Sequence, residues 1–229
     1  MKILIPPSEG KSSKNKTSIK FKDTNNKFIG KINDLINQLS KYKSSDLQKI
    51  YGVTKEKSIE LHNQNLNIFE SECSMAIDRY TGVVYNNLNP ASLDKRSNEF
   101  LNKKILITSA MLGLISPNEL IPLYKLKMNV LRLHDYWKPL FTEYLAKEDL
   151  IIDLLPEVHR KSYDSKNIFK INFYFEKNGK LISSGHNGKV IKGKYLKYIV
   201  ENQIDRLDGF KSFNEDGFKW QNNGFIKKI

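Results

Sequence analysis

Disulfide bonds and membrane-spanning segments are the first features that this sequence lacks. Its 229 residues include one cysteine, Cys73, so no intramolecular disulfide can form, and a reducing compartment suits the chain. Mean hydropathy is -0.51, and the longest apolar runs fall far short of the roughly 20 residues that span a bilayer. Met1–Pro7 has too short an apolar core for a signal peptide and predicts a β-strand. We therefore expect a cytoplasmic protein without membrane association.

Patterns that indicate a metal site or a known catalytic centre are also missing. The four histidines show no metal-ligand spacing to one another or to Cys73, so we expect no metal and no other cofactor. The candidate catalytic residues are Ser109, which follows a buried strand outside any GxSxG elbow, and His186, which lies in a glycine-rich loop beside lysines. A hydrogen bond within its own loop would explain His186 equally well.

Arginine is scarce in a chain that is otherwise strongly basic. The formal net charge is +13, yet only five of the 38 basic residues are arginine. A charge this positive favours a polyanionic partner such as nucleic acid or a phosphorylated ligand. Lysine serves phosphate contacts as a point charge, whereas bidentate reading of bases relies on arginine. A codon bias toward lysine, asparagine and isoleucine would produce the same charge without any partner.

The order of expected elements indicates an α/β protein with a single mixed sheet and a helical insertion at about residues 27–79. Strands are predicted, from apolar runs or from alternation, at Ile3–Ile5, Ile105–Ile107, Pro122–Met128, Leu150–Leu155 and Ile168–Phe175. Helices are predicted at Lys27–Lys43, Phe69–Arg79, Leu93–Asn102 and His134–Lys147. A strand and turn are expected at Tyr80–Leu88, a hairpin turn at Asn178-Gly179, and short strands after Leu207 that close the sheet. No repeat or linker divides the chain, so we expect one domain over residues 1–229.

Two short helices around Gly52 are similar to a helix-hairpin-helix. Leu47 and Ile50 predict the first helix, Gly52 predicts a tight turn, and Thr54 can cap the second helix. In such a hairpin, backbone N–H groups can contact a phosphate of DNA. Lys55 adds positive charge there, so Gly52 and Lys55 are candidate DNA contacts. A plain helical hairpin is the alternative interpretation.

Lysines also follow strands or begin helices at other places in the chain. Lys11 lies in a polar loop just beyond the first strand, where ligands often bind in α/β proteins, although the Walker pattern is absent. Lys189 and Lys192 fall in the first turns of a predicted helix, where the helix dipole favours anions over cations. Bound phosphate or DNA would offset that cost, and a solvated basic face is the alternative. Ile105–Met128 combines a buried strand, small residues and a basic segment with Lys125, and it also predicts a site.

Six segments occur in the order of a known family pattern. They are Met1–Lys11, Tyr80–Leu88, Ile105–Met128, Trp137, His186–Asn202 and Asp216–Phe218. Residues that agree with the pattern include Gly82, Tyr85, Ser109, Gly113, Tyr124, Lys189, Lys192 and Gly193. Taken together, these segments resemble the YaaA family of peroxide stress resistance proteins. Lys125 stands where that family has arginine, which keeps the charge and loses the bidentate geometry.

The resemblance implies a mixed α/β fold with a helix-hairpin-helix element, a cytoplasmic location and a role in the response to hydrogen peroxide. It also implies DNA binding through a basic cleft. The candidate nucleic-acid contacts are Lys11, Gly52, Lys55, Tyr124, Lys125, Lys189 and Lys192. We expect a monomer that binds duplex or distorted DNA mainly through phosphates. The alternatives are an enzyme that acts on a nucleotide or nucleic acid in the same cleft, and an interaction protein for acidic partners.

Overall fold

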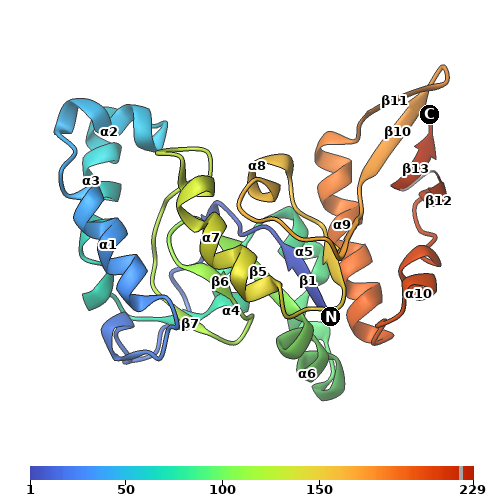
Figure 1. Cartoon of the computed structure of the whole chain (residues 1–229), viewed down its shortest axis with the longest axis horizontal. Coiled ribbons are helices and arrows are strands. Elements are labelled where there is room, and N and C mark those ends of the chain that lie inside the picture. Colours follow the sequence, from blue (N-terminus) through green and yellow to red (C-terminus); the bar gives the residue numbers. More distant parts are fainter. Residues whose placement is uncertain (222–223) are drawn as a thin grey trace.

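A five-stranded sheet that contains β1, β5 and β6 lies at the centre of the protein (Figure 1). Its strand order is β6-β5-β1-β8-β9. The computed structural model describes residues 1–221 and 224–229. The strands are β1 Lys2–Ile5, β5 Ile105–Ser109, β6 Gly113–Ile115, β8 Ile151–Asp153 and β9 Ile168–Lys170. β1, β5, β8 and β9 are parallel, and β6 pairs antiparallel with β5. Every residue of β5 and β8 is buried, which explains why both are mainly apolar runs.

The chain uses both sides of β1. β5 lies on one side, and β8, which comes later in the sequence, lies on the other. In open α/β sheets, such a reversal leaves a crevice outside the carboxyl ends of the strands, and ligands bind there. The segments that begin at Pro6 and Leu154 leave the sheet at this edge. The predicted strands at Ile3–Ile5 and Ile105–Ile107 are confirmed, and the strand predicted at Leu150–Leu155 is confirmed in part, because β8 covers only Ile151–Asp153. Their order marks where a site should be sought.

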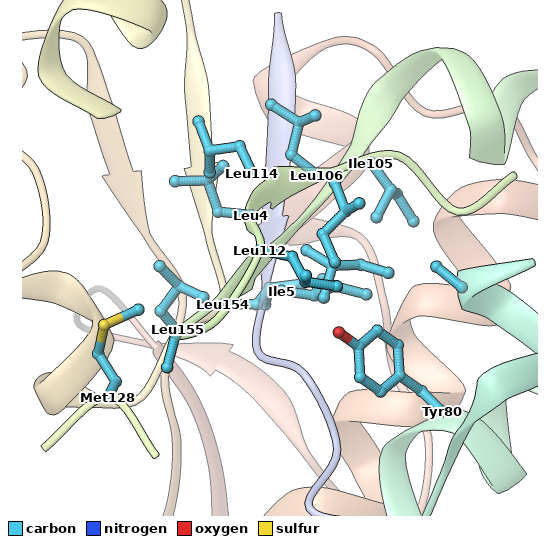
Figure 2. Close-up of a cluster of buried hydrophobic side chains, with 14 of the residues drawn as sticks. Leu4, Ile5, Tyr80, Ile105, Leu106, Leu112, Leu114, Met128, Leu154 and Leu155 are labelled. Carbon is cyan, nitrogen blue, oxygen red and sulfur yellow. The ribbon is translucent and has the colours of Figure 1, made fainter. Parts of the chain in front are cut away.

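The sheet is held by a continuous apolar core. Figure 2 shows side chains from β1, β5, β6 and the segment after β8 packed together: Leu4, Ile5, Ile105, Leu106, Leu114, Leu154 and Leu155. Trp137 of α7 (Leu133–Leu145) packs on another part of this core, where its indole N–H donates to the Ala110 carbonyl oxygen at 2.8 Å. Gly113 leaves room for that ring and for Phe28, because a Cβ atom at Gly113 would lie 3.1 Å from Trp137.

Three helices between β1 and β5 lie together at one end of the molecule (Figure 1). They are α1 Ile29–Leu39, α2 Ser44–Tyr51 and α3 Lys55–Leu66. Gly52 joins α2 to α3 in the left-handed conformation, with φ of 66°, which glycine adopts without strain. The Thr54 hydroxyl accepts the Lys57 N–H at 3.4 Å and caps α3. The helical hairpin is confirmed, and the helix predicted over Lys27–Lys43 is shorter at both ends.

Shorter elements connect these parts. The remaining helices are α4 Ala76–Arg79, α5 Val83–Leu88, α6 Lys95–Lys104, α8 Glu157–Arg160, α9 Gly185–Glu201 and α10 Leu207–Lys211, with 3-10 turns at Phe21–Asp23, Ile68–Glu70 and Pro90–Ser92. Two short ladders pair β2 Gly10–Lys11 with β4 Tyr80–Thr81, and β3 Ser74–Met75 with β7 Leu120–Ile121. The helices predicted over Leu93–Asn102 and His134–Lys147 are confirmed as α6 and α7, with shifted ends. No helix within residues 1–221 or 224–229 has the length and apolar character needed to span a membrane.

The C-terminal third builds a second sheet, which corrects the prediction of one mixed sheet closed by the tail. Its strands are β10 Phe173–Lys177, β11 Lys180–Ser183, β12 Lys219–Gln221 and β13 Gly224–Lys228, in the order β11-β10-β13-β12. The predicted strand Ile168–Phe175 is split, because β9 belongs to the first sheet and β10 to the second. Aromatic packing favours this arrangement, since Phe225 of β13 stacks on Phe173 with ring centroids 5.3 Å apart. Asn178-Gly179 forms the predicted turn between β10 and β11.

Two predictions between residues 69 and 88 are wrong. Within Phe69–Arg79, α-helix is limited to α4, and a 3-10 turn covers the start. The backbone near Cys73 pairs with a distant segment instead, because the Cys73 N–H donates to the Ile19 carbonyl oxygen at 3.0 Å. Tyr80–Leu88 is a strand only over β4, and α5 follows directly. α5 buries Val84, Tyr85 and Leu88 at helical spacing.

The predicted strand at Pro122–Met128 is also wrong, although its alternation of burial is correct. Tyr124, Leu126 and Met128 are buried, and the intervening Lys125 is partly exposed. The backbone of Lys125 finds its partners in a side chain rather than in a strand. The side-chain amide of Asn65 accepts the Lys125 N–H at 3.0 Å and donates to the Lys125 carbonyl at 2.7 Å.

α9 packs directly on α5, and Gly193 makes this contact possible. A Cβ atom at Gly193 would lie against the Val84 carbonyl oxygen and 2.5 Å from the Cβ atom of Asn87. We expect Gly193→Ala to lower the free energy of unfolding by about 1–3 kcal/mol, because the two helices must move apart. Chemical denaturation measures this change.

Gly30→Ala is the matched control for Gly193→Ala. Gly30 is an exposed residue of α1, and a Cβ atom there would meet nothing within 4 Å. Alanine favours a helix over glycine by up to about 1 kcal/mol, so Gly30→Ala should stabilise the protein slightly. Equal losses of stability in both variants would contradict the proposed packing of α5 and α9.

Candidate functional site

A pocket with a volume of about 630 Å³ opens at the carboxyl ends of β1, β5 and β8. Its lining comes from five parts of the chain: residues 6–11, residues 82–85, Ala110, residues 124–129, and the segment from α8 to α9 that supplies Pro156, Val158, His159, Lys189 and Lys192. Five predicted contacts line it, namely Lys11, Tyr124, Lys125, Lys189 and Lys192. The other candidates, Gly52, Lys55, Ser109 and His186, are not part of this lining.

Lys11 supplies one positive centre of the pocket. It belongs to β2, which pairs with β4, and its ammonium donates to the Ser8 carbonyl oxygen at 2.9 Å. The ammonium also lies 4.2 Å from the centroid of the Tyr124 ring, in a cation–π contact. Burial lowers the pKa of Lys11 to about 7, and the neighbouring charge of Lys125 acts in the same direction. Lys11 therefore changes its charge near neutral pH.

Lys125 and Lys127 extend this positive centre toward the rim. Both contact the carboxylate of Glu9, at 3.0 Å from Lys125 and 3.3 Å from Lys127. Burial opposes ionisation of Glu9, but the two lysines outweigh it and lower the pKa of that carboxyl group. The Glu9 side chain is 64% exposed, so this ion pair is accessible to solvent and to a competing anion. We call Lys11, Lys125, Lys127 and Glu9 the Lys11 cluster.

Lys189 and Lys192 of α9 supply a second positive centre, which we call the Lys192 cluster. Lys192 donates to the Leu154 carbonyl oxygen, just after β8. Burial lowers the pKa of Lys192 to about 8; the positive charges of Arg160 and Lys189 add to this effect, and Asp153 opposes it. Lys189 is exposed at the pocket. The predicted helix that carries both lysines is confirmed as α9 and begins at Gly185.

A buried ion pair between Asp153 and Arg160 lies next to the Lys192 cluster. Asp153 is fully buried at the end of β8 and accepts hydrogen bonds from the Arg160 guanidinium at 3.0 Å, the Tyr163 hydroxyl at 2.8 Å and the Leu155 N–H at 2.7 Å. These three donors satisfy the carboxylate. Asp153 therefore orders the segment after β8. Its negative charge acts on Lys192 at a distance and raises the pKa of that ammonium group.

His159 lines the pocket, and sequence reasoning did not single it out. Its Nδ1 atom lies 2.9 Å from the Thr108 hydroxyl of β5, which leaves Nε2 as the other polar atom of the ring. Burial lowers the pKa of His159 to about 4, so the ring is neutral at pH 7. The signal that could have found it is positional, because His159 follows a third buried strand as closely as Lys11 follows the first.

Ser109 lies behind the pocket wall, in a network with two tyrosines. Its hydroxyl is 2.7 Å from the Tyr124 hydroxyl, which in turn lies 2.6 Å from the Tyr80 hydroxyl. The Ser109 oxygen also accepts the N–H groups of Met111 at 3.2 Å and Leu112 at 3.0 Å. Burial raises the pKa of Tyr124 to about 12. The observed role of Ser109 is to hold the bend after β5 and to orient Tyr124.

The three remaining candidates from the sequence, and the cysteine, lie elsewhere. Lys55 is the exposed first residue of α3. His186 is exposed in the first turn of α9. Gly52 lies in the helical hairpin, where its own N–H donates to the Gln48 carbonyl oxygen at 2.8 Å. Cys73 is buried, and burial raises the pKa of its thiol to about 11, which disfavours the reactive thiolate.

The helical hairpin is nevertheless connected to the pocket through Asn65. This α3 residue is fully buried and makes the paired hydrogen bonds to the backbone of Lys125 described above. Its amide also donates to the Tyr51 hydroxyl of α2 at 3.1 Å, and that hydroxyl lies 3.1 Å from Nδ1 of His62. One buried network therefore joins both helices of the hairpin to a pocket lysine.

The lowered pKa of Lys192 predicts how stability depends on pH. The group has its ordinary pKa of 10.5 when unfolded and about 8 when folded, so the unfolded state binds more protons between these values. The free energy of unfolding should therefore rise with pH across this window, by at most about 1.4 kcal/mol per pH unit for this proton. Lys192→Met should remove that part of the rise. Denaturation at several pH values from 7.5 to 9.5 measures the slope.

A loss of stability that is the same at every pH does not change the slope of unfolding free energy against pH, so the slopes of the variant and the unmodified protein can be compared directly. Lys180→Met, which changes an exposed lysine of β11, serves as the control and should keep the slope of the unmodified protein. Identical slopes in Lys192→Met and the unmodified protein would show that Lys192 is not desolvated.

Comparisons with known proteins agree with the resemblance seen in the sequence. A UPF0246 protein of Streptococcus gordonii is 28% identical over 215 residues, covering 85% of this chain and 87% of its own length. A UPF0246 protein of Francisella philomiragia is 27% identical over 241 residues, covering 96% of this chain and 94% of its own. The family model described as "Peroxide stress protein YaaA" matches residues 1–224. The chain therefore belongs to the YaaA family of peroxide stress proteins.

Proposed function

We propose that this protein binds DNA in the peroxide stress response, through phosphate contacts at the pocket and at the helical hairpin. The observation that carries the proposal is the convergence of Lys11, Lys125, Lys189 and Lys192, which come from distant parts of the sequence, on one pocket. A codon bias would scatter lysines over the surface and would not gather them at the carboxyl edge of a parallel sheet. This edge is where α/β proteins bind ligands.

The electrostatics of the pocket support an anionic partner. Lys11 and Lys192 are partly buried, and within residues 1–221 and 224–229 their ammonium groups donate to carbonyl oxygens rather than to carboxylates. Holding two such charges away from water costs stability, and a bound phosphate would offset that cost. The net charge of +13 adds long-range attraction to a polyanion.

The hairpin of α2 and α3 offers a second contact to the same strand of nucleic acid. Because the Gly52 N–H is already bonded to Gln48, the backbone donors for a phosphate would come from the first turn of α3, beside Lys55. Asn65 ties α3 to Lys125, so the two contact regions are held in a fixed relation. We propose that a monomer, built as a single domain in the cytoplasm, engages duplex or distorted DNA with both regions.

Salt dependence tests this proposal. We expect the logarithm of DNA affinity to fall linearly with the logarithm of salt concentration, because phosphate contacts release counterions. The double variant Lys189→Ala/Lys192→Ala should bind more weakly and reduce the slope by about 0.9 for each lost phosphate contact. Fluorescence anisotropy with single-stranded, duplex and gapped DNA at several salt concentrations gives both quantities.

A second double variant separates contact from overall charge. Lys180→Ala/Lys219→Ala removes the same charge from exposed residues of the second sheet and should leave the slope nearly unchanged. Equal weakening by both double variants would indicate attraction to net charge alone. DNA binding that does not respond to salt, or no binding to any DNA, would overturn the proposal.

An enzyme that acts on a nucleotide or nucleic acid is the second candidate, and the chemistry of the pocket favours it over a passive surface. Lys11, with a pKa of about 7, could accept or donate a proton at physiological pH, and the neutral ring of His159 lines the same cavity as a hydrogen-bonding group. Turnover of a nucleotide or DNA substrate that is lost in Lys11→Met, with the fold intact, would support catalysis. DNA that is bound and recovered unchanged would limit the function to binding.

A further inference from the structure

The size of the pocket limits which part of a nucleic acid can enter it. A volume of about 630 Å³ falls within the roughly 300–1,000 Å³ of small-ligand sites. Double-stranded DNA is too wide for such a cavity and could only cover its mouth. A single nucleotide that is unpaired and turned out of the stack has a suitable size.

The walls of the pocket suit a sugar and a base better than an isolated phosphate. Every contributing segment supplies at least one apolar residue to the lining: Pro6, Val84, Ala110, Leu126, Met128 and Val158, with the ring of Tyr85 beside them. A purely electrostatic phosphate site has no use for this apolar surface, whereas the flat faces of bases pack against apolar and aromatic side chains. His159 and Asn129 add polar groups that could meet the edge of a base.

The lysines of the pocket fall into two separate clusters rather than one. The Lys11 ammonium donates to the Ser8 carbonyl oxygen beyond β1 and lies over the Tyr124 ring, while Lys125 and Lys127 pair with Glu9. The Lys192 ammonium has a different anchor, because it donates to the Leu154 carbonyl oxygen beyond β8. A nucleotide within a strand carries one phosphate on each side of its sugar, so two positive centres around an apolar wall match its chemistry.

We propose that this pocket binds one unpaired nucleotide, with base and sugar on the apolar wall and the 5′ and 3′ phosphates at the Lys11 and Lys192 clusters. Both clusters are positive, so either one can hold the 5′ phosphate while the other holds the 3′ phosphate. That this nucleotide belongs to a DNA strand rests on the proposed function. A free nucleoside 3′,5′-bisphosphate has the same chemistry and does not depend on it.

Two probes test the ligand class and its source. The first is thymidine 3′,5′-bisphosphate, compared with thymidine 5′-monophosphate by isothermal titration calorimetry. We expect the bisphosphate to bind at least about tenfold more tightly, because it engages both clusters. Lys11→Met or Lys192→Met should abolish most of this advantage, and Lys180→Met should preserve it. Circular dichroism of each variant checks that the fold is intact.

The second probe is a duplex that carries one unpaired 2-aminopurine, whose fluorescence rises when the base leaves the stack. We expect the fluorescence to rise on binding, and to rise less in Lys192→Met at saturating protein. A rise together with bisphosphate binding supports the inference for DNA. Bisphosphate binding without a fluorescence change, or without DNA binding of any kind, supports the ligand class and assigns a free nucleotide as its source.

The inference and the proposed function fail in different ways. Salt-dependent DNA binding with no bisphosphate binding and unchanged 2-aminopurine fluorescence would overturn the nucleotide pocket and leave DNA binding intact. Equal affinities for the monophosphate and the bisphosphate would overturn the assignment of two phosphate positions. Absence of binding to every probe would overturn both.

Discussion

The burial of three parallel strands, β5, β1 and β8, is the constraint on which the rest of this structure depends. The side chains of these strands are covered on both faces of the sheet. The segments that connect the strands must therefore begin and end where the strands end. Several of these segments leave at the carboxyl edge and line one pocket. The position of the hydrophobic core therefore determines where the polar residues of the pocket come together.

The buried lysines of the pocket lower the stability of the folded protein. Lysines that lie partly buried against carbonyl oxygens would be more stable in water, and apolar residues of similar size would pack in their place without an electrostatic cost. Nearby acidic groups do not remove this cost. Glu9 is bound to the more exposed Lys125 and Lys127, and Asp153 is saturated by Arg160, Tyr163 and a backbone N–H. Charge that is left uncompensated in this way is expected of a binding site and is unexpected of a structural ion pair.

Local patterns in the sequence were sufficient for much of the fold. Apolar runs identified β1, β5 and β8, and helical spacing identified α1, α6 and α7. Residues 69–88 could not be interpreted in this way, because Cys73 pairs with Ile19, and Gly193 lies against Val84, across distances in sequence that no local pattern records. The second sheet was missed for the same reason, since β10 and β13 are far apart in the chain.

The candidate site was predictable to a similar extent and for a related reason. The residues that carry charge beside a strand end or a helix start, such as Lys11 and Lys192, could be selected because both features are local. His159 follows β8 as closely as Lys11 follows β1, but its contact with Thr108 of β5 is recorded by no local pattern. The role of the Asn65 amide could not be predicted either, because its partner is the backbone of Lys125, 60 residues away.

The contact between α5 and α9 also sets the distance between two walls of the pocket. α5 contributes Val84 and Tyr85 to the apolar wall, and α9 contributes Lys192, the residue directly before Gly193. The wall and the lysine are thus spaced by a glycine that meets a carbonyl oxygen of the opposite helix. A side chain at this position would move α9 away from α5 and so increase the distance between the apolar wall and Lys192.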